Sequence, residues 1–290
     1  MSYGMPPAEP AAAPVCPRHP DRISYVRCQR CGRPTCTECQ RPAAVGIHCV
    51  DCVRELAAPP ARTRYGARAG TSGQPIITWS IIAACGIVYA LQWLIPNDEV
   101  YQDFAYATAL TATEPWRMLT SAFLHSQGFV LHIALNMYTL WIFGRILEPA
   151  LGRIRYLAVY LISAVGGSVG FFVLTPVSMN GVIGASGAIF GLFGALFVVV
   201  RQRGGDVSQL LILIGINAVL GFVIQGIAWQ AHLGGFITGG LATAVIAYAP
   251  RGRFQLAVQI GGLALVAILL VVLAFARAGT LGGSLPTTAV

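Results

Sequence analysis

The chain has 290 residues, of which 56% are hydrophobic and 10% are charged. Soluble globular proteins are roughly 25% charged, so this composition excludes an ordinary soluble enzyme, a disordered chain and a coiled coil. The formal net charge of +8 comes from 19 arginines without any lysine and must be interpreted by position along the chain. It does not by default predict nucleic-acid binding.

The amino-terminal part divides into three segments. Residues 1–15 are rich in Pro and Ala and lack the basic start and apolar stretch of a secretory signal, so we expect a disordered, cytoplasmic terminus. Residues 16–55 hold seven of the eight cysteines and two of the five histidines. Residues 56–75 lack an apolar period and predict a linker.

Four pairs of ligands predict that 16–55 is a zinc-binding module. The pairs are Cys16-x-x-His19, Cys28-x-x-Cys31, Cys36-x-x-Cys39 and Cys49-x-x-Cys52, with His48 beside the last one. Two tetrahedral sites need eight ligands and nine candidates are present, so one of His48 and Cys49 is spare. A disulfide framework is the competing interpretation, but a cytoplasmic location is reducing and favours metal. Since apolar residues are few, the metal would supply most of the folding free energy.

The module resembles small cross-braced zinc modules of the B-box or zinc-ribbon kind. A cross-brace would place Cys16, His19, Cys36 and Cys39 on one ion and Cys28, Cys31, Cys49 and Cys52 on the other, with sequential pairing as the alternative. Protein ligands then fill every position, so we expect two structural Zn²⁺ ions. Seven arginines against five acidic residues in 1–60 are too small an excess to predict nucleic-acid binding, and a cytoplasmic protein partner is favoured.

Long uncharged segments after the linker predict membrane-spanning helices, because about 20 apolar residues suffice to cross a bilayer. We place seven spans at 76–95, 129–147, 156–176, 183–200, 208–225, 230–249 and 255–276. Six form a core over 76–250, and an additional helix over 251–276 precedes a tail at 277–290. The predicted fold is an all-α polytopic membrane protein, preceded by the small zinc-binding module.

Arginine positions predict the orientation, since short cytoplasmic loops carry the basic excess. Arginines precede the first span and follow the second, fourth and sixth, whereas the loop after the first span carries four acidic residues and a single Arg117. We therefore expect a cytoplasmic amino terminus and an external carboxyl terminus. The all-Arg, Ala- and Gly-rich composition is typical of a GC-rich bacterial source, for which the bilayer would be the plasma membrane.

Four polar side chains within the predicted spans are candidate site residues, because polar groups at membrane depth are costly unless partnered. His132 and Asn136 lie four residues apart on one face of the second span, Ser186 begins the fourth and His232 begins the sixth. The topology puts all four near the outer leaflet. Each also has a structural interpretation, as a hydrogen bond to the preceding turn or between helices.

Together these residues predict amide hydrolysis with a serine nucleophile. His232 would accept the proton of Ser186, while Asn136, His132 and the Ser186 N–H would stabilise an oxyanion near the start of a helix. No Asp or Glu lies in these spans at that depth, so a Ser–His dyad is predicted and a buried triad is excluded.

The order of the motifs closely resembles the rhomboid family of intramembrane serine proteases, over about residues 76–250. The matching segments are Trp116-Arg117, Phe123-Leu124-His125, His132-Ile133-Ala134-Leu135-Asn136, Gly144 with Leu147-Glu148, Gly184-Ala185-Ser186-Gly187, and Ala231-His232-Leu233-Gly234-Gly235 with Gly239. The resemblance implies that Ser186 is the nucleophile, His232 the general base, and His132 with Asn136 the oxyanion stabilisers. It also implies substrates that are single-span membrane proteins, cut near the outer membrane face, and catalysis without a cofactor.

Two residues depart from the family pattern. His125 lies seven residues before His132, a longer spacing than the family's, and is given no catalytic role. Phe190 stands where a Tyr often packs against the catalytic His, which preserves an aromatic wall without the hydroxyl.

The seventh span resembles the family's six-plus-one variants, whose extra helix is peripheral. A catalytically silent adaptor of the same fold, binding transmembrane segments, is the alternative function.

Small residues at three- and four-residue spacing predict that the fourth and sixth spans approach closely. They are Gly187, Gly191 and Gly194 on one span and Gly235 and Gly239 on the other. Such an approach would allow a Ser on one helix to reach a His on the other. For Trp116-Arg117 we favour a structural role in the outer loop.

Overall fold

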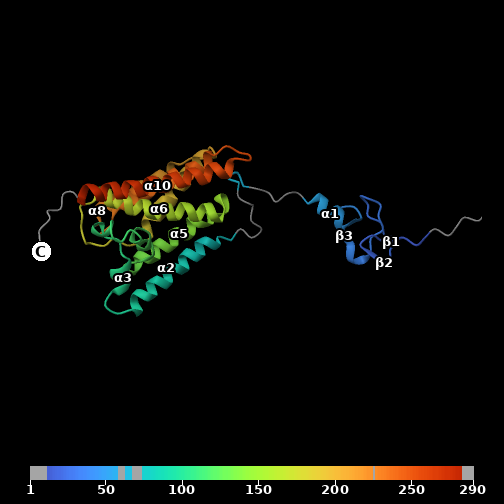
Figure 1. The fold of residues 1–290 in the computed structure, drawn as a ribbon, viewed down its shortest axis with the longest axis horizontal. Coiled ribbons are helices and arrows are strands. Elements are labelled where there is room, and N and C mark those ends of the chain that lie inside the picture. Colours follow the sequence, from blue (N-terminus) through green and yellow to red (C-terminus); the bar gives the residue numbers. More distant parts are fainter. Residues whose placement is uncertain (1–11, 58–62, 67–73, 225, 283–290) are drawn as a thin grey trace, which may run out of the picture. The chain divides into compact units, whose positions relative to one another are not determined.

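The computed structural model describes residues 12–57, 63–66, 74–224 and 226–282. The chain divides into two compact units, Met1–Ala61 and Arg62–Val290 (Figure 1). We name their described parts the head unit, 12–57, and the membrane unit, from 63 onward. Residues 1–11 of the expected disordered segment 1–15, most of the expected linker 56–75, and residues 283–290 of the expected tail 277–290 lie outside the described residues. Val15 of the first segment lies in a strand, and the last helix continues to Gly282, into the expected tail.

The head unit consists of two short hairpins and one helix. β1 (Val15–Cys16) pairs with β2 (His19–Ile23), β3 (Gln40–Pro42) pairs with β4 (Ile47–Cys49), and η1 (Thr37–Cys39) and α1 (Val50–Leu56) complete it. Gly46 forms the turn between β3 and β4 at φ 67°, a conformation that glycine adopts without strain. The apolar side chains buried among the described residues of this unit are six cysteines, Cys16, Cys28, Cys36, Cys39, Cys49 and Cys52. Sulfur therefore takes the place of an aliphatic core.

Seven long helices build the membrane unit (Figure 1). They are α2 (Ile76–Leu94), α5 (Val130–Leu151), α6 (Arg153–Leu174), α7 (Ser186–Gln202), α8 (Ser208–Val223), α9 (Trp229–Tyr248) and α10 (Gln255–Gly282). Five are long and apolar enough to cross a membrane, and α7 and α8 are shorter apolar helices. This is the predicted polytopic all-α fold, which confirms the expected fold class. The fourth span starts at Ser186 instead of 183, because Gly184 at φ 123° interrupts the helix.

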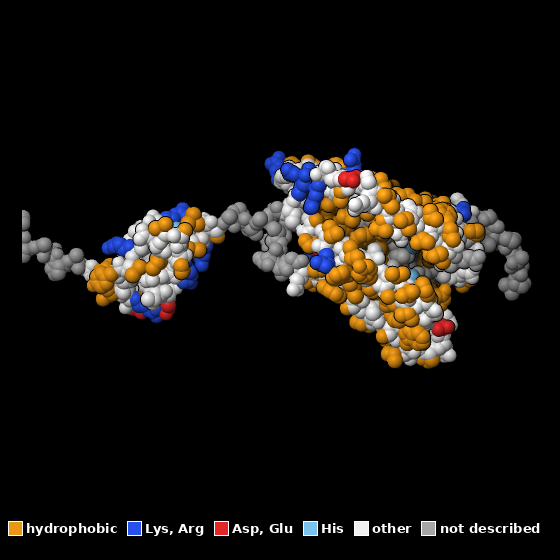
Figure 2. Space-filling view, turned by 180° about the vertical axis from the view of Figure 1, so that it is seen from behind, with side chains coloured by type: hydrophobic (Ala, Val, Ile, Leu, Met, Phe, Trp, Pro, Cys, Tyr) orange, Lys and Arg blue, Asp and Glu red, His pale blue; other side chains and the backbone are white. Residues whose placement is uncertain are grey.

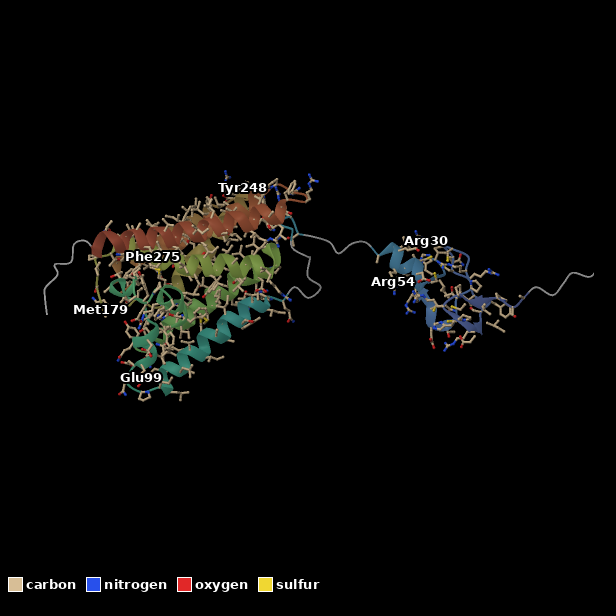
Figure 3. The ribbon with its side chains drawn as sticks, in the orientation of Figure 1. Arg30, Arg54, Glu99, Met179, Tyr248 and Phe275 are labelled. Carbon is tan, nitrogen blue, oxygen red and sulfur yellow. The ribbon has the colours of Figure 1, made fainter. Side chains whose placement is uncertain are left out.

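A folded loop joins α2 to α5. It contains α3 (Glu99–Phe104), η2 (Thr108–Leu110), α4 (Arg117–Thr120) and η3 (Ser121–Phe123). Arg117 is buried in this loop, pairs with the Glu114 carboxylate and donates hydrogen bonds to the carbonyl oxygens of Gln102 and Ala105. Glu99 and Met179, from two different loops, lie at the same end of the unit, and Tyr248 lies toward the other (Figure 3).

Three helices of the membrane unit, α6, α7 and α9, touch at glycines. A Cβ atom added to Gly167 of α6 would lie 3.2 Å from Gly187 Cα of α7, and one added to Gly170 would lie 2.7 Å from Gly234 Cα of α9. A Cβ on Gly235 would collide with the carbonyl oxygen of Gly187. These backbones therefore approach as the small residues of the sequence indicate.

A buried carboxylate fixes the start of α2. Glu148 of α5 is 2% exposed and accepts hydrogen bonds from the backbone N–H groups of Ile77 and Thr78, each at 2.9 Å, and from Thr78 Oγ1 at 2.8 Å. The first N–H groups of a helix lack partners within the helix and carry partial positive charge. Glu148 accepts from two of these N–H groups and thereby ties α2 to α5.

Residues 63–66, within the segment expected to be a linker, pack against the helical bundle. Tyr65 is fully buried, and its hydroxyl donates to Gln202 Oε1 of α7 at 3.0 Å. Gln259 of α10 donates to the Tyr65 carbonyl oxygen at 3.1 Å and to that of Ile246 on α9 at 3.0 Å. Tyr65 therefore joins the seventh helix to the core.

Candidate active site and metal centres

Ser186 and His232 come together from two packed helices. Ser186 is the first residue of α7, and His232 lies in the first turn of α9. The distance between Ser186 Oγ and His232 Nε2 is 2.9 Å, which is hydrogen-bond distance. Gly187 follows Ser186 directly, and Gly235 lies three residues after His232. The close contact between these two glycines brings the two side chains within reach.

The imidazole of His232 is held against an aromatic wall. Phe190, one turn after Ser186 on α7, stacks on it with ring centroids 4.1 Å apart and an interplanar angle of 8°. Nδ1 of His232 is buried and has no hydrogen-bond partner among the described residues. Ser186 and His232 thus form a pair without a third hydrogen-bonded residue among those described, and stacking on Phe190 orients the imidazole ring.

His132 of α5 lies near Ser186, against the backbone of Gly184. A Cβ atom at Gly184 would be 2.8 Å from His132 Nε2 and 3.8 Å from Ser186 Oγ. Glycine is needed here both for its positive φ and for this lack of space. His132 Nε2 and Ser186 Oγ therefore flank one small region that lies next to a helix start.

Asn136 lies one turn after His132 on the same helix and is 8% exposed. Its Nδ2 donates to the His132 carbonyl oxygen at 2.7 Å. One N–H of the amide is thus engaged with its own helix, and the second N–H of Nδ2 can donate elsewhere.

Two further residues are connected to His132, one directly and one through the first. His125, to which the sequence assigned no role, is fully buried with its ring centroid 5.2 Å from that of His132. Gln92 of α2 hydrogen-bonds to the backbone of His125 at both its N–H and its carbonyl oxygen. Gln92 was not singled out by the sequence analysis, although a polar residue in an apolar span is a signal of the kind used for the other four.

The head unit gathers eight ligand residues into two groups. Cys16, His19, Cys36 and Cys39 form one, and Cys28, Cys31, Cys49 and Cys52 form the other, with the ligand atoms of each group within 4.8 Å of one another. His48 belongs to neither group. Zn–S bonds of about 2.3 Å in a tetrahedron separate the sulfurs by about 3.8 Å, and Cys31 Sγ and Cys49 Sγ are 3.8 Å apart. Both groups can hold a metal ion, in the cross-braced grouping.

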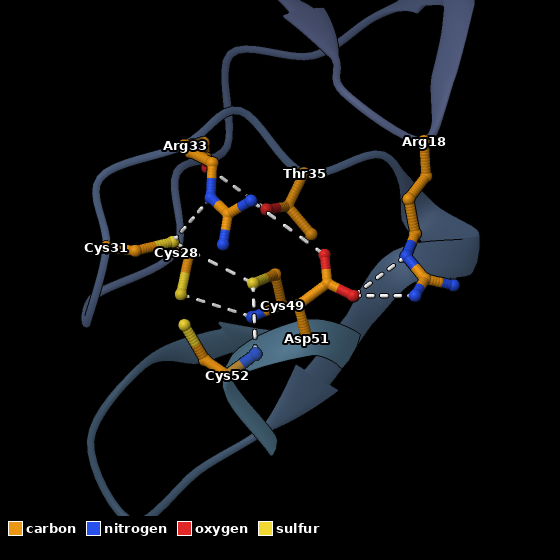
Figure 4. Close-up of polar contacts among 8 residues, drawn as sticks. All are labelled: Arg18, Cys28, Cys31, Arg33, Thr35, Cys49, Asp51 and Cys52. Carbon is orange, nitrogen blue, oxygen red and sulfur yellow. Dashed lines mark hydrogen bonds and ion pairs between the residues drawn. The ribbon is translucent and has the colours of Figure 1, made fainter. Parts of the chain in front are cut away.

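Backbone and arginine donors surround the second group (Figure 4). Cys28 Sγ accepts from the Cys49 N–H at 3.2 Å, and Arg33 Nε donates to Cys31 Sγ at 3.3 Å. Such bonds favour thiolates, the form that binds metal. Asp51 forms ion pairs with Arg18 at 2.6 Å and Arg33 at 4.0 Å, and the Arg18 guanidinium lowers the pKa of its carboxyl group. Asp51 thus connects the surroundings of the two groups.

Comparison with known proteins defines the class. Residues 112–249 match the model of the Rhomboid domain. The putative rhomboid protease YdcA of Bacillus subtilis (strain 168) is 35% identical over 176 residues, which cover 58% of this chain and 86% of YdcA. The chain therefore belongs to the rhomboid family.

Two longer relatives extend the comparison. The rhomboid protease GluP of Bacillus subtilis (strain 168) is 33% identical over 216 residues, which are 70% of this chain and 40% of GluP. RHOMBOID-like protein 4 of Arabidopsis thaliana is 36% identical over 147 residues, 48% of this chain and 36% of the relative. The chain thus spans less than half of these two proteins. The bacterial relatives support an intramembrane protease of the rhomboid type.

Proposed function

We propose that this protein is an intramembrane serine endopeptidase that uses a Ser186–His232 dyad. The observation that carries the proposal is the 2.9 Å distance between Ser186 Oγ and His232 Nε2. Since His232 Nδ1 has no acceptor among the described residues, no third catalytic group is assigned. The membership of the rhomboid family and the names of GluP and YdcA support the same reaction.

In the proposed mechanism, Ser186 Oγ attacks the carbonyl carbon of the scissile peptide bond while its proton passes to His232 Nε2. His232 then protonates the leaving amine, and the acyl-enzyme forms. A water molecule, deprotonated by His232, attacks the acyl carbon and releases the acid with Ser186 restored. The oxyanion accepts hydrogen bonds from the Ser186 N–H, from His132 Nε2 and from the second N–H of the Asn136 amide.

The length of α7 supports cleavage within the membrane. Its 17 residues span about 25 Å, less than the roughly 30 Å of a hydrocarbon core. Arg201 and Arg203 occupy its carboxyl end, where an interface is favoured, so Ser186 at the other end lies below the opposite surface. A nucleophile at that depth suits single-span membrane proteins as substrates.

The distribution of charge supports an orientation with the active site toward the outer face. Figure 2 shows the basic side chains of the membrane unit gathered mainly at one end. The loop between α2 and α5 carries four acidic residues, Asp98, Glu99, Asp103 and Glu114. The basic end is expected to be cytoplasmic. We therefore propose a plasma-membrane protein with its head unit in the cytoplasm and its carboxyl terminus outside.

For the head unit we propose two structural Zn²⁺ ions. Cys₃His and Cys₄ ligand sets are typical of closed zinc sites, in which no position remains for a substrate. Catalysis needs neither ion, and the head unit would serve a cytoplasmic protein partner.

A fluorophosphonate probe for activated serines tests the dyad. The purified protein, Ser186→Ala and His232→Ala would be compared for labelling and for cleavage of a single-span substrate. Ser80→Ala is the matched control, because the Ser80 hydroxyl only bonds the Ile76 carbonyl oxygen of its own helix at an exposed position. We expect labelling and cleavage in the wild type and the control alone. Cleavage by either dyad variant would overturn the assignment, and an unlabelled wild type beside a reactive rhomboid protease would favour the silent adaptor.

A further inference from the structure

Gln92 is a buried amide near the carboxyl end of α2, and both of its polar atoms bind one residue. Its Nε2 donates to the His125 carbonyl oxygen at 3.0 Å, and its Oε1 accepts from the His125 N–H at 3.0 Å. The side chain is 5% exposed. An amide of this kind fits a backbone segment in one orientation only, because donor and acceptor are not interchangeable.

The peptide group between His125 and Ser126 is therefore held on both sides. Its carbonyl oxygen accepts from Gln92, and its N–H, that of Ser126, donates to His132 Nδ1 at 3.2 Å. Because the peptide is planar and trans, fixing its carbonyl also fixes the direction of its N–H. Gln127 fastens the same loop to α2 by donating to the Gln92 carbonyl oxygen at 2.9 Å.

A bond accepted at Nδ1 determines which nitrogen of His132 carries the proton. A neutral imidazole has one donor and one acceptor nitrogen, so acceptance at Nδ1 leaves the proton on Nε2. His132 Nε2 is the nitrogen that faces the Gly184 backbone beside Ser186. The chain of contacts thus presents an N–H donor to the place where the proposed oxyanion forms.

We propose that Gln92 is a positioning residue for the reaction. By orienting the His125–Ser126 peptide it keeps His132 in the Nε2–H tautomer, although it lies on a different helix, α2, that packs beside α5 (Figure 1). The inference rests on the proposed oxyanion role of His132. Gln92 would thus assist the proposed reaction without touching the substrate or the dyad.

The test combines the tautomer of His132 with kinetics. ¹⁵N NMR of histidine-labelled full-length protein in detergent reports the protonation of each ring nitrogen, and His132→Ala identifies the His132 signals. Gln92→Met keeps the length of the side chain and removes both hydrogen-bonding atoms. Gln92→Glu retains an acceptor for the His125 N–H but, when ionised, has no donor for the His125 carbonyl oxygen. Gln102→Met is the matched control, since the exposed Gln102 amide only donates to the Asn97 carbonyl oxygen.

We expect the Nε2–H tautomer in the wild type and the control, and a mixture of tautomers in both Gln92 variants. Loss of one oxyanion donor typically costs 10²–10³-fold in rate, so a disordered donor should lower kcat by about tenfold or more. KM should stay within about twofold, because the oxyanion exists only during the reaction.

Three results would overturn the inference. The first is a wild-type His132 protonated at Nδ1, which needs no variant to fold. The second is an unchanged tautomer and kcat in both Gln92 variants while His132→Ala is slow, which leaves the proposed function standing. The third is a fully active His132→Ala, which removes the oxyanion role as well, whereas only persistent cleavage by Ser186→Ala or His232→Ala removes the dyad.

Discussion

The head unit and the membrane unit both bring together reactive side chains that are distant in sequence, but they do so by different means. In the head unit the buried apolar side chains are cysteines whose thiols point at one another. In the membrane unit, glycine contacts between α6, α7 and α9 allow Ser186 to meet His232. The interior of the head unit is thus made of side chains that can bind metal, while the interior of the membrane unit depends on the shape of its helices.

The largest effect that separates the two units should follow from removing metal. Structural zinc contributes about 10–16 kcal/mol in small zinc-binding peptides near neutral pH. A strong chelator, or Cys28→Ser with Cys52→Ser, should therefore unfold the head unit and make 12–57 sensitive to limited proteolysis. The membrane unit should keep its probe labelling at Ser186, because its described interior is built from its own helices.

Metal analysis of the same samples is the control for this prediction. The intact protein should hold two zinc ions per chain, and so should Cys85→Ala, because Cys85 lies buried in α2 and in neither ligand group. His48→Ala should also retain both ions, whereas His19→Ala should lose affinity at one site. Equal metal loss from the two histidine variants would contradict the cross-braced grouping.

A single methyl group should test the close packing of the membrane unit. In Gly235→Ala the added Cβ meets the carbonyl oxygen of Gly187, the residue directly after Ser186. Overpacking of this kind costs about 1–3 kcal/mol, and the shift should also separate Ser186 from His232. We expect a lower midpoint of denaturation in SDS and reduced labelling by the serine probe.

Gly86→Ala on α2 is the matched substitution, because a Cβ there has no atom within 4 Å among those described. Alanine favours a helix over glycine by about 1 kcal/mol, so this variant should be as stable as the wild type or more stable. If both variants lost stability equally, helix propensity and not contact would explain the glycines.

The sequence predicted the helices, and the meeting of Ser186 with His232, better than the hydrogen bonds around them. Long uncharged segments predicted the seven helices, and the spacing of glycines on the fourth and sixth spans predicted which helices approach closely. The start of α7 was placed three residues early because the positive φ of Gly184 is a tertiary feature. Gln92 and Tyr65 were missed because each acts through a partner far along the chain, His125 and Gln202. No local pattern encodes such pairs.

The buried Glu148 side chain should show how much a helix cap contributes to the stability of the helical bundle. Glu148→Gln keeps the size of the side chain but replaces the charged acceptor of two helix N–H groups and the Thr78 hydroxyl. Hydrogen bonds to charged groups contribute about 1.5–3 kcal/mol, and glutamine keeps one acceptor, so we expect a loss of about 1–2 kcal/mol. The free energy of unfolding in SDS measures it.

Thr78→Val is the companion variant, since it removes the hydroxyl donor and leaves the backbone cap in place. It should cost less than Glu148→Gln. The opposite order would mean that the side-chain bond, and not the start of α2, is what Glu148 stabilises.

Tyr65, near the amino-terminal end of the membrane unit, offers the smallest and most selective change. Tyr65→Phe removes the hydroxyl that donates to Gln202 and keeps the buried ring. One neutral hydrogen bond contributes about 1 kcal/mol net, so the membrane unit should lose roughly that much stability. Tyr25→Phe is the control, because Tyr25 lies in the head unit with 78% of its surface exposed. If Tyr65→Phe were neutral while Tyr65→Ala strongly destabilised the unit, the ring alone would anchor this segment. Shape, and not polar bonding, would then join residues 63–66 to the helices, as it joins α6, α7 and α9 to one another.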